Sequence, residues 1–321
     1  MRLCGKKPPS IEGNGFKGHS LCYAAVENIV WVGMQLRYEG QIYRPPSEAN
    51  SLILQATIGC TYNKCTFCQS FREKKFRIRT TEELFEDLSM ARRYYGHVRR
   101  IYLADANALC MPLEQLLEIL SFIRKTFPEC ERVSTHACAQ DVLNKTPEEL
   151  TDLREWGMGI IYVGGESGNP EVLRLVNKGV TREELIESVH KLRAAKILSS
   201  LTFISGLGGT RLWREHAIDT GTIISEMEPD YASLLTLILE PGMPLFDDLV
   251  NGTFERLSPQ QVLQETRLLI ENINVKRSCV FRSNHASNYL SLRGTLPMDK
   301  EKVLNQLASA KRLKPEEFRL L

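Results

Sequence analysis

Three cysteines lie close together in the segment GCTYNKCTFC, which spans residues 59–68. Four residues separate Cys60 from Cys65, and two separate Cys65 from Cys68. Soft thiolate ligands suit zinc and iron–sulfur clusters. A structural zinc site or an ordinary cubane cluster takes four protein ligands, whereas only three thiols are close here. A cubane cluster on three cysteines would leave one iron open, and an open coordination position is what metal-based catalysis requires.

The cysteines lie within a chain of alternating strand and helix patterns. Short apolar runs predict six strands, at 51–59, 99–106, 132–137, 158–165, 199–209 and 231–239. Capped periodic segments predict helices at 80–96, 111–127, 146–157, 169–179, 181–196 and 214–227. Such alternation predicts a parallel sheet with right-handed crossovers. Because six βα units cannot close an eight-stranded barrel, we expect an α/β fold with a partial (β/α)6 TIM-like barrel over residues 50–240.

In such folds the functional site lies at the carboxyl ends of the parallel strands. Polar or glycine residues follow most of the predicted strands. They are Cys60 to Cys68, Asp105, His136, Glu166 and the segment from Gly206 to Gly209. We therefore expect these residues to surround one site.

The alternation of predicted strands and helices stops after residue 240. Pro241, Gly242 and Pro244 interrupt the alternation. A predicted helix at 258–273 is followed by a short apolar segment at 279–281, a loop, and a helical pair from Asp299 to Phe318. We expect residues 241–321 to form a mainly helical C-terminal extension packed on the barrel.

Residues 1–49 form an N-terminal extension in this scheme. Its first part, residues 1–33, has no clear period, and the composition changes at Met34. We expect residues 1–33 to be dispensable, either because they are disordered or because Met34 is the native start.

The composition excludes several classes of protein. The net charge of +2 gives no electrostatic reason to expect a nucleic acid or a membrane as partner. No apolar run reaches the roughly 18 residues that a membrane span needs. The nine cysteines are an odd number in a long chain, which does not favour a disulfide framework. We expect a cytoplasmic protein whose clustered thiols bind metal.

The cysteine segment resembles the cluster loop of the radical S-adenosylmethionine (SAM) superfamily. That superfamily usually has three residues between the first two cysteines, so the spacing here is one residue longer. The segment VGGESGNPEVLRLVNKGVT, at 163–181, resembles the branch that contains oxygen-independent coproporphyrinogen oxidases, Elp3-like enzymes and methylthiotransferases. The resemblance covers about residues 34–310.

The resemblance implies two cofactors and a reaction. Cys60, Cys65 and Cys68 would bind a [4Fe-4S] cluster, and SAM would bind its open iron. A flavodoxin or ferredoxin would supply the electron that cleaves SAM to a 5′-deoxyadenosyl radical. This radical would abstract hydrogen from a substrate that the sequence does not identify.

The resemblance also implies contacts to SAM. Phe67 would pack near the adenine, and Glu166 would point toward SAM. Lys178, twelve residues after Glu166, would pair with the SAM carboxylate as a point charge. In the segment ISGLGG, Gly206 and Gly208 would let the backbone lie against the adenine.

Two further residues have weaker support. The superfamily often has GGE after its second strand, whereas this chain has LADAN at 103–107. Asp105 could accept hydrogen bonds from the SAM ammonium group there, or could simply cap a turn. His136 ends the third predicted strand and is either a polar contact to SAM or substrate or a structural histidine.

Other readings remain open at this stage. The chain could be a non-catalytic protein that binds zinc or an iron–sulfur cluster. Cys110, Cys130, Cys138 and Cys279 lack mutual ligand spacing, so we expect no second cluster. The segments RPPSEA (44–49) and SNHASNYL (283–290) are either plain loops or parts of the substrate pocket. In the second case the pocket residues would be Arg44, Asn284, His285 and Asn288.

Overall fold

The computed structural model of the 321-residue chain describes residues 24–25 and 37–310. The expectation for residues 1–33 lies outside the described residues, except at Ala24–Ala25. The last part of the expected terminal helical pair, from residue 311 onward, also lies outside them. Ala24–Ala25 form β1, which pairs with β2 (Tyr43–Arg44) in a short antiparallel ladder.

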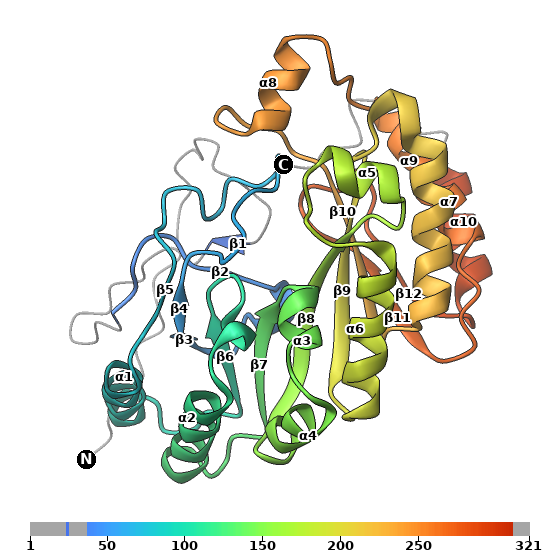
Figure 1. The fold of residues 1–321 in the computed structure, drawn as a ribbon. Coiled ribbons are helices and arrows are strands. Elements are labelled where there is room, and N and C mark those ends of the chain that lie inside the picture. The colour runs from blue at the N-terminus through green and yellow to red at the C-terminus, as the bar shows by residue number, and fades with distance from the viewer. Residues whose placement is uncertain (1–23, 26–36, 311–321) are drawn as a thin grey trace, which may run out of the picture.

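One eight-stranded sheet forms the centre of the molecule (Figure 1). Six of its strands are parallel neighbours in chain order. They are β3 (Leu52–Gln55), β6 (Arg100–Ala104), β7 (Arg132–Ala137), β8 (Met158–Glu166), β9 (Leu198–Ser205) and β10 (Tyr231–Thr236). β3 lies at one edge and does not pair with the other edge. The prediction of a partial barrel with six parallel strands is confirmed.

Two strands of the C-terminal extension continue the same sheet. β11 (Cys279–Ser283) pairs parallel to β10, and β12 (Leu292–Leu296) pairs antiparallel to β11. The sequence predicted only a short apolar segment and a loop here, because each strand has five residues and little apolar periodicity. The helices of the extension are α8 (Pro244–Val250), α9 (Pro259–Glu271) and α10 (Lys300–Ala310).

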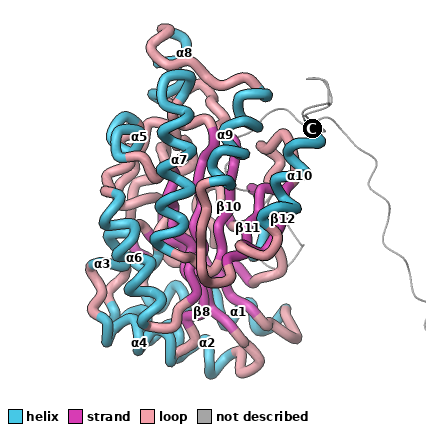
Figure 2. Tube along the Cα trace, turned by 90° about the vertical axis from the view of Figure 1, so that its right-hand side faces the viewer, coloured by secondary structure: helices cyan, strands magenta, loops and turns pink. Residues whose placement is uncertain are grey.

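Helices cover the outer face of the curved sheet, as Figures 1 and 2 show. Contacts run in chain order from one helix to the next along this face. The helices are α1 (Thr81–Tyr94), α2 (Leu113–Thr126), α4 (Pro147–Glu155), α6 (Arg182–Ala194) and α7 (Gly209–Met227). The short helices α3 (Ala139–Leu143) and α5 (Pro170–Leu175) follow β7 and β8. Within the described residues, no helix is both long and apolar enough to cross a membrane.

Capping residues explain where several of these helices begin. Thr80, Thr146 and Thr181 each accept a hydrogen bond from a backbone N–H three residues later, and a glutamate at that later position bonds back. These capping boxes satisfy backbone donors that the first helical turn leaves free. The sequence therefore fixes the start of α1, α4 and α6 locally.

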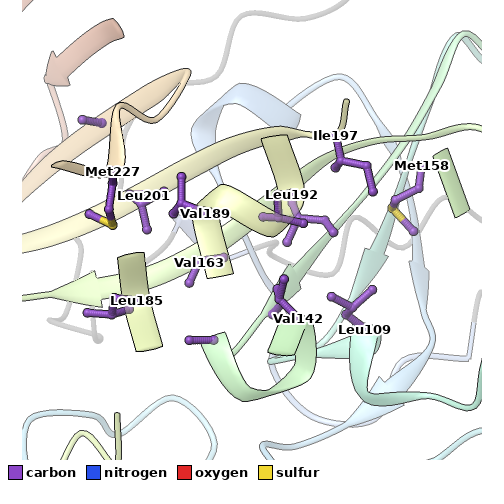
Figure 3. Packing of buried hydrophobic residues seen from close by; sticks show 14 of the residues in the cluster. Leu109, Val142, Met158, Val163, Leu185, Val189, Leu192, Ile197, Leu201 and Met227 are labelled. Atoms are coloured by element: carbon purple, nitrogen blue, oxygen red, sulfur yellow. The ribbon is translucent and has the colours of Figure 1, made fainter. Parts of the chain in front are cut away.

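The main hydrophobic core lies between these helices and the sheet (Figure 3). Leu185, Val189 and Leu192 of α6 share this core with Val163 of β8 and Leu201 of β9, and all five are at most 1% exposed. Burying one large aliphatic side chain is worth about 1.5–3 kcal/mol. This packing holds the strands whose carboxyl ends carry the predicted residues.

The inner face of the sheet is closed at its amino end by the RPPSEA segment. A 3-10 turn at Pro46–Glu48 places the Glu48 carboxylate in the interior, with no exposed surface. Its Oε1 accepts hydrogen bonds from Arg132 Nη2 at 2.6 Å and from the Tyr162 hydroxyl at 2.5 Å. Because Arg132 begins β7, this network lies at the end of the barrel opposite the predicted site.

The cysteine segment projects from the sheet on its own small hairpin. β4 (Thr57–Ile58) leads into it, and β5 (Arg77–Ile78) returns antiparallel to β4. Arg79, directly after β5, is almost fully buried. Its Nη1 donates to Asp87 Oδ2 of α1 at 2.7 Å and to the Gln55 carbonyl of β3 at 3.0 Å. This buried ion pair ties the hairpin to α1 and β3.

Asp87→Ala should strongly destabilise the protein, because the buried Arg79 guanidinium then keeps only Glu83, 3.6 Å from its Nε, as a counter-ion. The expected loss is about 3–5 kcal/mol in the free energy of unfolding, measured by urea denaturation. Glu271→Ala is the matched control, since it removes an exposed helical ion pair with Arg267. The control variant should lose less than about 1 kcal/mol in the free energy of unfolding. Equal losses in the two variants would contradict the structural role of the buried pair.

Candidate functional site

The residues predicted from the strand ends surround one cavity of about 140 Å³, here called the cluster cavity. Asp105, His136 and Glu166 of its lining lie at the carboxyl ends of β6, β7 and β8. Figure 1 shows α5 and α8 at this end of the sheet. Its lining includes eight of the predicted residues. These are Cys60, Cys65, Phe67, Cys68, Asp105, His136, Glu166 and Lys178.

The loop that carries the three cysteines is held by a single guanidinium group. Arg72 donates from Nε to the Cys68 carbonyl at 3.0 Å and from Nη2 to the Cys65 carbonyl at 2.5 Å. Its Nη1 lies 3.4 Å from the Asn63 carbonyl. The Asn63 amide in turn donates to the Phe71 carbonyl at 2.8 Å. Arg72 therefore fixes the backbone of two cysteines, a role that its place in the sequence does not reveal.

The same loop docks on the segment that follows β8 and α5. The Tyr62 hydroxyl donates to Asn177 Oδ1 at 2.8 Å, and the Thr66 N–H donates to the Val176 carbonyl at 3.0 Å. Gly179 has φ +70°, and a Cβ atom there would collide with the Tyr62 ring. A glycine is therefore needed at 179 for backbone conformation and for close packing.

Glu166 and Lys178 form an ion pair beside the thiols. Lys178 Nζ lies 2.9 Å from Glu166 Oε1, and both side chains are largely buried. Burial lowers the pKa of Lys178, but Glu166 and the neighbouring Cys65 more than offset this effect, so the pKa lies above its ordinary value. A Cβ at Gly164 would collide with Glu166 Oε1 and lie 2.9 Å from Lys178 Nζ. Gly164, the first glycine of VGGE at the end of β8, thus leaves the room that this pair occupies.

Asp105 already has partners in the protein. Its Oδ2 accepts from Lys74 Nζ at 2.7 Å and from the Gly59 N–H at 3.0 Å. Burial raises the pKa of Asp105, and Lys74 opposes that shift. Its Oδ1 is buried without a hydrogen-bond partner among the described residues. A buried acceptor without a partner is costly, so this oxygen suits a donor supplied by a bound molecule.

Phe67 and His136 both line the cluster cavity. Phe67 packs in a small cluster with Val172, Ile204 and Leu245. His136 Nδ1 forms a short hydrogen bond with the Tyr102 hydroxyl. Burial lowers the pKa of His136 to about 3, so the ring is neutral near pH 7. Both positions agree with the strand ends assigned from sequence.

Gly206 and Gly208 do not line the cluster cavity, whereas Ile204 does. Gly206 has φ +86°, and its N–H donates to Glu265 Oε2 at 2.6 Å. A Cβ at Gly208 would lie 3.0 Å from the Leu212 carbonyl group within α7. These two glycines shape the turn between β9 and α7, and their contact with the adenine stays a prediction.

Cys138 is a cavity residue that the sequence did not single out. It follows β7, and its thiol hydrogen-bonds with Cys60. This bond lowers the pKa of Cys60 to about 6 and raises that of Cys138. Cys60 and Cys138 are distant in sequence, so spacing could not reveal the contact. Within residues 24–25 and 37–310, no three His, Cys, Asp or Glu side chains converge to hold a metal ion by themselves.

A second cavity of about 310 Å³, here called the second chamber, adjoins the first. The two cavities share His136, Thr202 and Leu235 in their linings. The two segments whose role was left open both reach the second chamber. RPPSEA contributes Pro45, Pro46 and Ser47, and SNHASNYL contributes Asn284 and His285.

The two other candidates from these segments do not line the second chamber. Asn288 donates to the Leu234 carbonyl at 2.8 Å and accepts from the Thr236 hydroxyl at 2.9 Å. It therefore holds its loop on β10. Arg44 lies on β2 and is absent from the lining.

Comparisons with known proteins give the family. A family model described as the Radical SAM superfamily matches residues 54–220, more than half of the chain. An uncharacterised methyltransferase of Pyrococcus horikoshii is 24% identical over 198 residues, which cover 61% of this chain and 41% of the relative. An anaerobic magnesium-protoporphyrin IX monomethyl ester cyclase of Cereibacter sphaeroides is 24% identical over 67% of this chain and 34% of its own. The chain thus spans less than half of these curated relatives.

A solved structure shows the same fold. Coproporphyrinogen III oxidase from Escherichia coli, described as a radical SAM enzyme, aligns with a TM-score of 0.53 at 19% identity. The alignment covers 69% of this chain and 52% of that chain. Radical SAM proteins use a [4Fe-4S] cluster and SAM, and they require a reductant and a substrate. The match over more than half of its residues shows that this chain belongs to the radical SAM superfamily, and its cofactors are a [4Fe-4S] cluster and SAM.

Proposed function

We propose that this chain is an enzyme that removes hydrogen from a carbon of a small substrate held in the second chamber. The observation that carries the proposal is the shared wall of His136, Thr202 and Leu235 between the two cavities. When bound, the cluster and SAM supply a 5′-deoxyadenosyl radical for hydrogen abstraction. The protein itself would bind the cluster, SAM and the substrate, orient the substrate toward SAM, and exclude water from the site.

Cys60, Cys65 and Cys68 are the proposed cluster ligands. Their thiols line one cavity, on a loop that Arg72 and the docking of Tyr62 hold in place. Three ligands leave one iron for SAM, as the chemistry requires. A non-catalytic zinc or iron–sulfur protein would have no need of the buried ion pair and the adjoining chamber.

The charged groups around the thiols fit the polar end of SAM. Lys178 would pair with the SAM carboxylate, and Glu166 would orient both Lys178 and the ligand. The unpartnered Oδ1 of Asp105 would accept a hydrogen bond from the SAM ammonium. Phe67 would pack against the adenine, and the turn at Gly206 and Gly208 would bound that end of the site.

Two parts of the proposal concern the rest of the reaction. His136 is neutral near pH 7 and lines both cavities, so it would contact SAM or substrate through hydrogen bonds without adding charge. We propose a flavodoxin or a ferredoxin as the electron donor, since radical SAM enzymes need a one-electron reductant.

Replacing Cys60, Cys65 and Cys68 together with Ala should abolish cluster binding, because no thiolate would remain on the loop. Iron and sulfide are measured after anaerobic reconstitution of wild type and variant. Cys110→Ala combined with Cys130→Ala is the control and should keep the wild-type iron content. About four irons per chain in the triple variant would refute these ligands. Zinc, rather than iron and sulfide, in the wild type would favour the non-catalytic alternative.

Glu166→Ala and Lys178→Ala should weaken SAM binding while leaving the cluster intact. Losing one charge-assisted hydrogen bond should cost roughly ten- to a hundredfold in affinity. Titration of SAM against the reduced cluster by electron paramagnetic resonance measures this loss. Glu171→Ala is the control, since Glu171 forms an exposed ion pair with Arg174 on α5. Wild-type affinity in both test variants would remove the pair from the SAM site.

Arg72→Ala should lower the retention of the cluster without unfolding the barrel. The variant loses hydrogen bonds to the carbonyls of Cys65 and Cys68, each worth about 1 kcal/mol. We expect faster loss of iron to a chelator than in wild type, with a native circular dichroism spectrum. Lys75→Ala, an exposed change in the same loop, should behave as wild type. Identical iron loss in all three proteins would argue against a positioning role for Arg72.

A further inference from the structure

Arg282 of β11 lies in a row of residues that crosses the inner face of the sheet. The register pairs Gly164 with Thr202, Thr202 with Ser233, and Ser233 with Arg282. Thr202, Ser233 and Arg282 are all half-buried and all line the second chamber. The row begins at Gly164, beside the Glu166–Lys178 pair, and ends at the Arg282 guanidinium. The chamber therefore runs from the cluster cavity to a cationic end.

Arg282 differs from three other cations around the two cavities, each of which has an acidic partner. Lys178 has Glu166, Lys74 has Asp105, and Arg132 has Glu48. Among the described residues, Arg282 makes no ion pair, and its Nη1 donates to the Phe281 carbonyl at 2.9 Å. The lining of the second chamber contains no aspartate or glutamate.

A second arginine increases the positive charge at this end. Arg293 of β12 is directly opposite Arg282 in the antiparallel ladder. Arg293 is exposed, so water screens its repulsion with Arg282. In the part of the chain that the structure describes, Arg293 also lacks an acidic partner within ion-pair distance. An anion bound at Arg282 would be attracted by the positive charge of both arginines.

His285 and Asn284 add neutral donors beside Arg282. The Ser287 N–H donates to His285 Nδ1 at 3.1 Å, so the neutral ring carries its hydrogen on Nε2. Burial lowers the pKa of His285, which favours this neutral form. The Nε2–H group and the Asn284 side-chain amide are donors on residues that line the same chamber as Arg282.

We infer that the second chamber binds a small substrate through an oxyanion, a carboxylate or a phosphate, held by Arg282 with Asn284 and His285. A guanidinium fork matches the paired oxygens of either group. The chamber's 310 Å³ lies at the lower end of ligand pockets, so the molecule is small. The anion lies at β11, and the carbon to be attacked lies toward His136. The reaction of the bound molecule rests on the proposed function, whereas the anion-binding site does not.

Binding of two probes tests the inference. Inorganic phosphate and succinate are titrated separately into full-length, anaerobically reconstituted protein by calorimetry. SAM is present in excess, so that Lys178 is occupied. Wild type should bind at least one probe, and Arg282→Gln should weaken that binding roughly ten- to a hundredfold. Preference for phosphate identifies a phosphate ester as the substrate class, and preference for succinate identifies a carboxylic acid.

Controls separate the site from general charge effects. Arg267→Gln on α9 removes the same charge at an exposed position and should bind the probe as wild type does. Arg282→Lys keeps the positive charge but loses the two-pronged guanidinium group. Its affinity for the probe should lie between those of wild type and Arg282→Gln. In the wild type, saturating probe should also slow phenylglyoxal modification of Arg282, followed by peptide mass spectrometry. This measurement needs no variant to fold.

Three results would overturn the inference. They are absence of binding of both probes by wild type, equal affinity in wild type and Arg282→Gln, and unchanged modification of Arg282 at saturating probe. SAM affinity and SAM cleavage are measured on the same samples. Normal cleavage without probe binding refutes the anion site alone. Failure of SAM binding alongside Arg282-dependent probe binding refutes the proposed reaction and leaves the anion site standing.

Discussion

The cluster loop and the segment after β8 hold each other in place, and most of the site depends on that contact. The loop carries the three thiols, and the segment carries Lys178. Tyr62 bridges them by bonding to Asn177 and by packing where Gly179 has no side chain. Because both segments are irregular, neither has a ladder of its own to fix it. Their mutual docking therefore fixes the distance between the three thiols and the Glu166–Lys178 ion pair.

Local sequence signals were sufficient for the barrel and for most of the cavity. Capping threonines and apolar runs set the six βα units, and parallel strands bring their carboxyl ends to one edge. Residues next to those ends, such as Asp105 and His136, could therefore be placed together without a structure. Glu166 was predicted from its place at the end of the fourth strand and from the family resemblance of its segment. The structure adds that Gly164 leaves room for its carboxylate.

The features that escaped prediction depend on contacts between distant residues. Cys138 and Cys60 are 78 positions apart and come together only in the folded chain. Arg72 bonds to backbone carbonyls, which every residue has, so no sequence pattern marks its partners. β11 and β12 are short, and they become strands because β10 offers a free edge. Gly206 and Gly208 shape the turn into α7, a role that only the backbone geometry reveals, and their contact with the adenine stays a prediction.

The C-terminal strands have a consequence for how new specificities can arise. The proposed ligands of the cluster and SAM come from the chain before residue 209, whereas Arg282, Asn284 and His285 come from one short stretch around β11. If the proposals hold, substitutions in that stretch would change the recognised molecule without altering the residues proposed to bind the cluster and SAM. The proposed substrate contacts and the proposed cofactor contacts therefore lie in separate parts of the chain. Descendants of such a fold could diversify by replacing one hairpin, and an engineer could graft a different hairpin onto the same barrel.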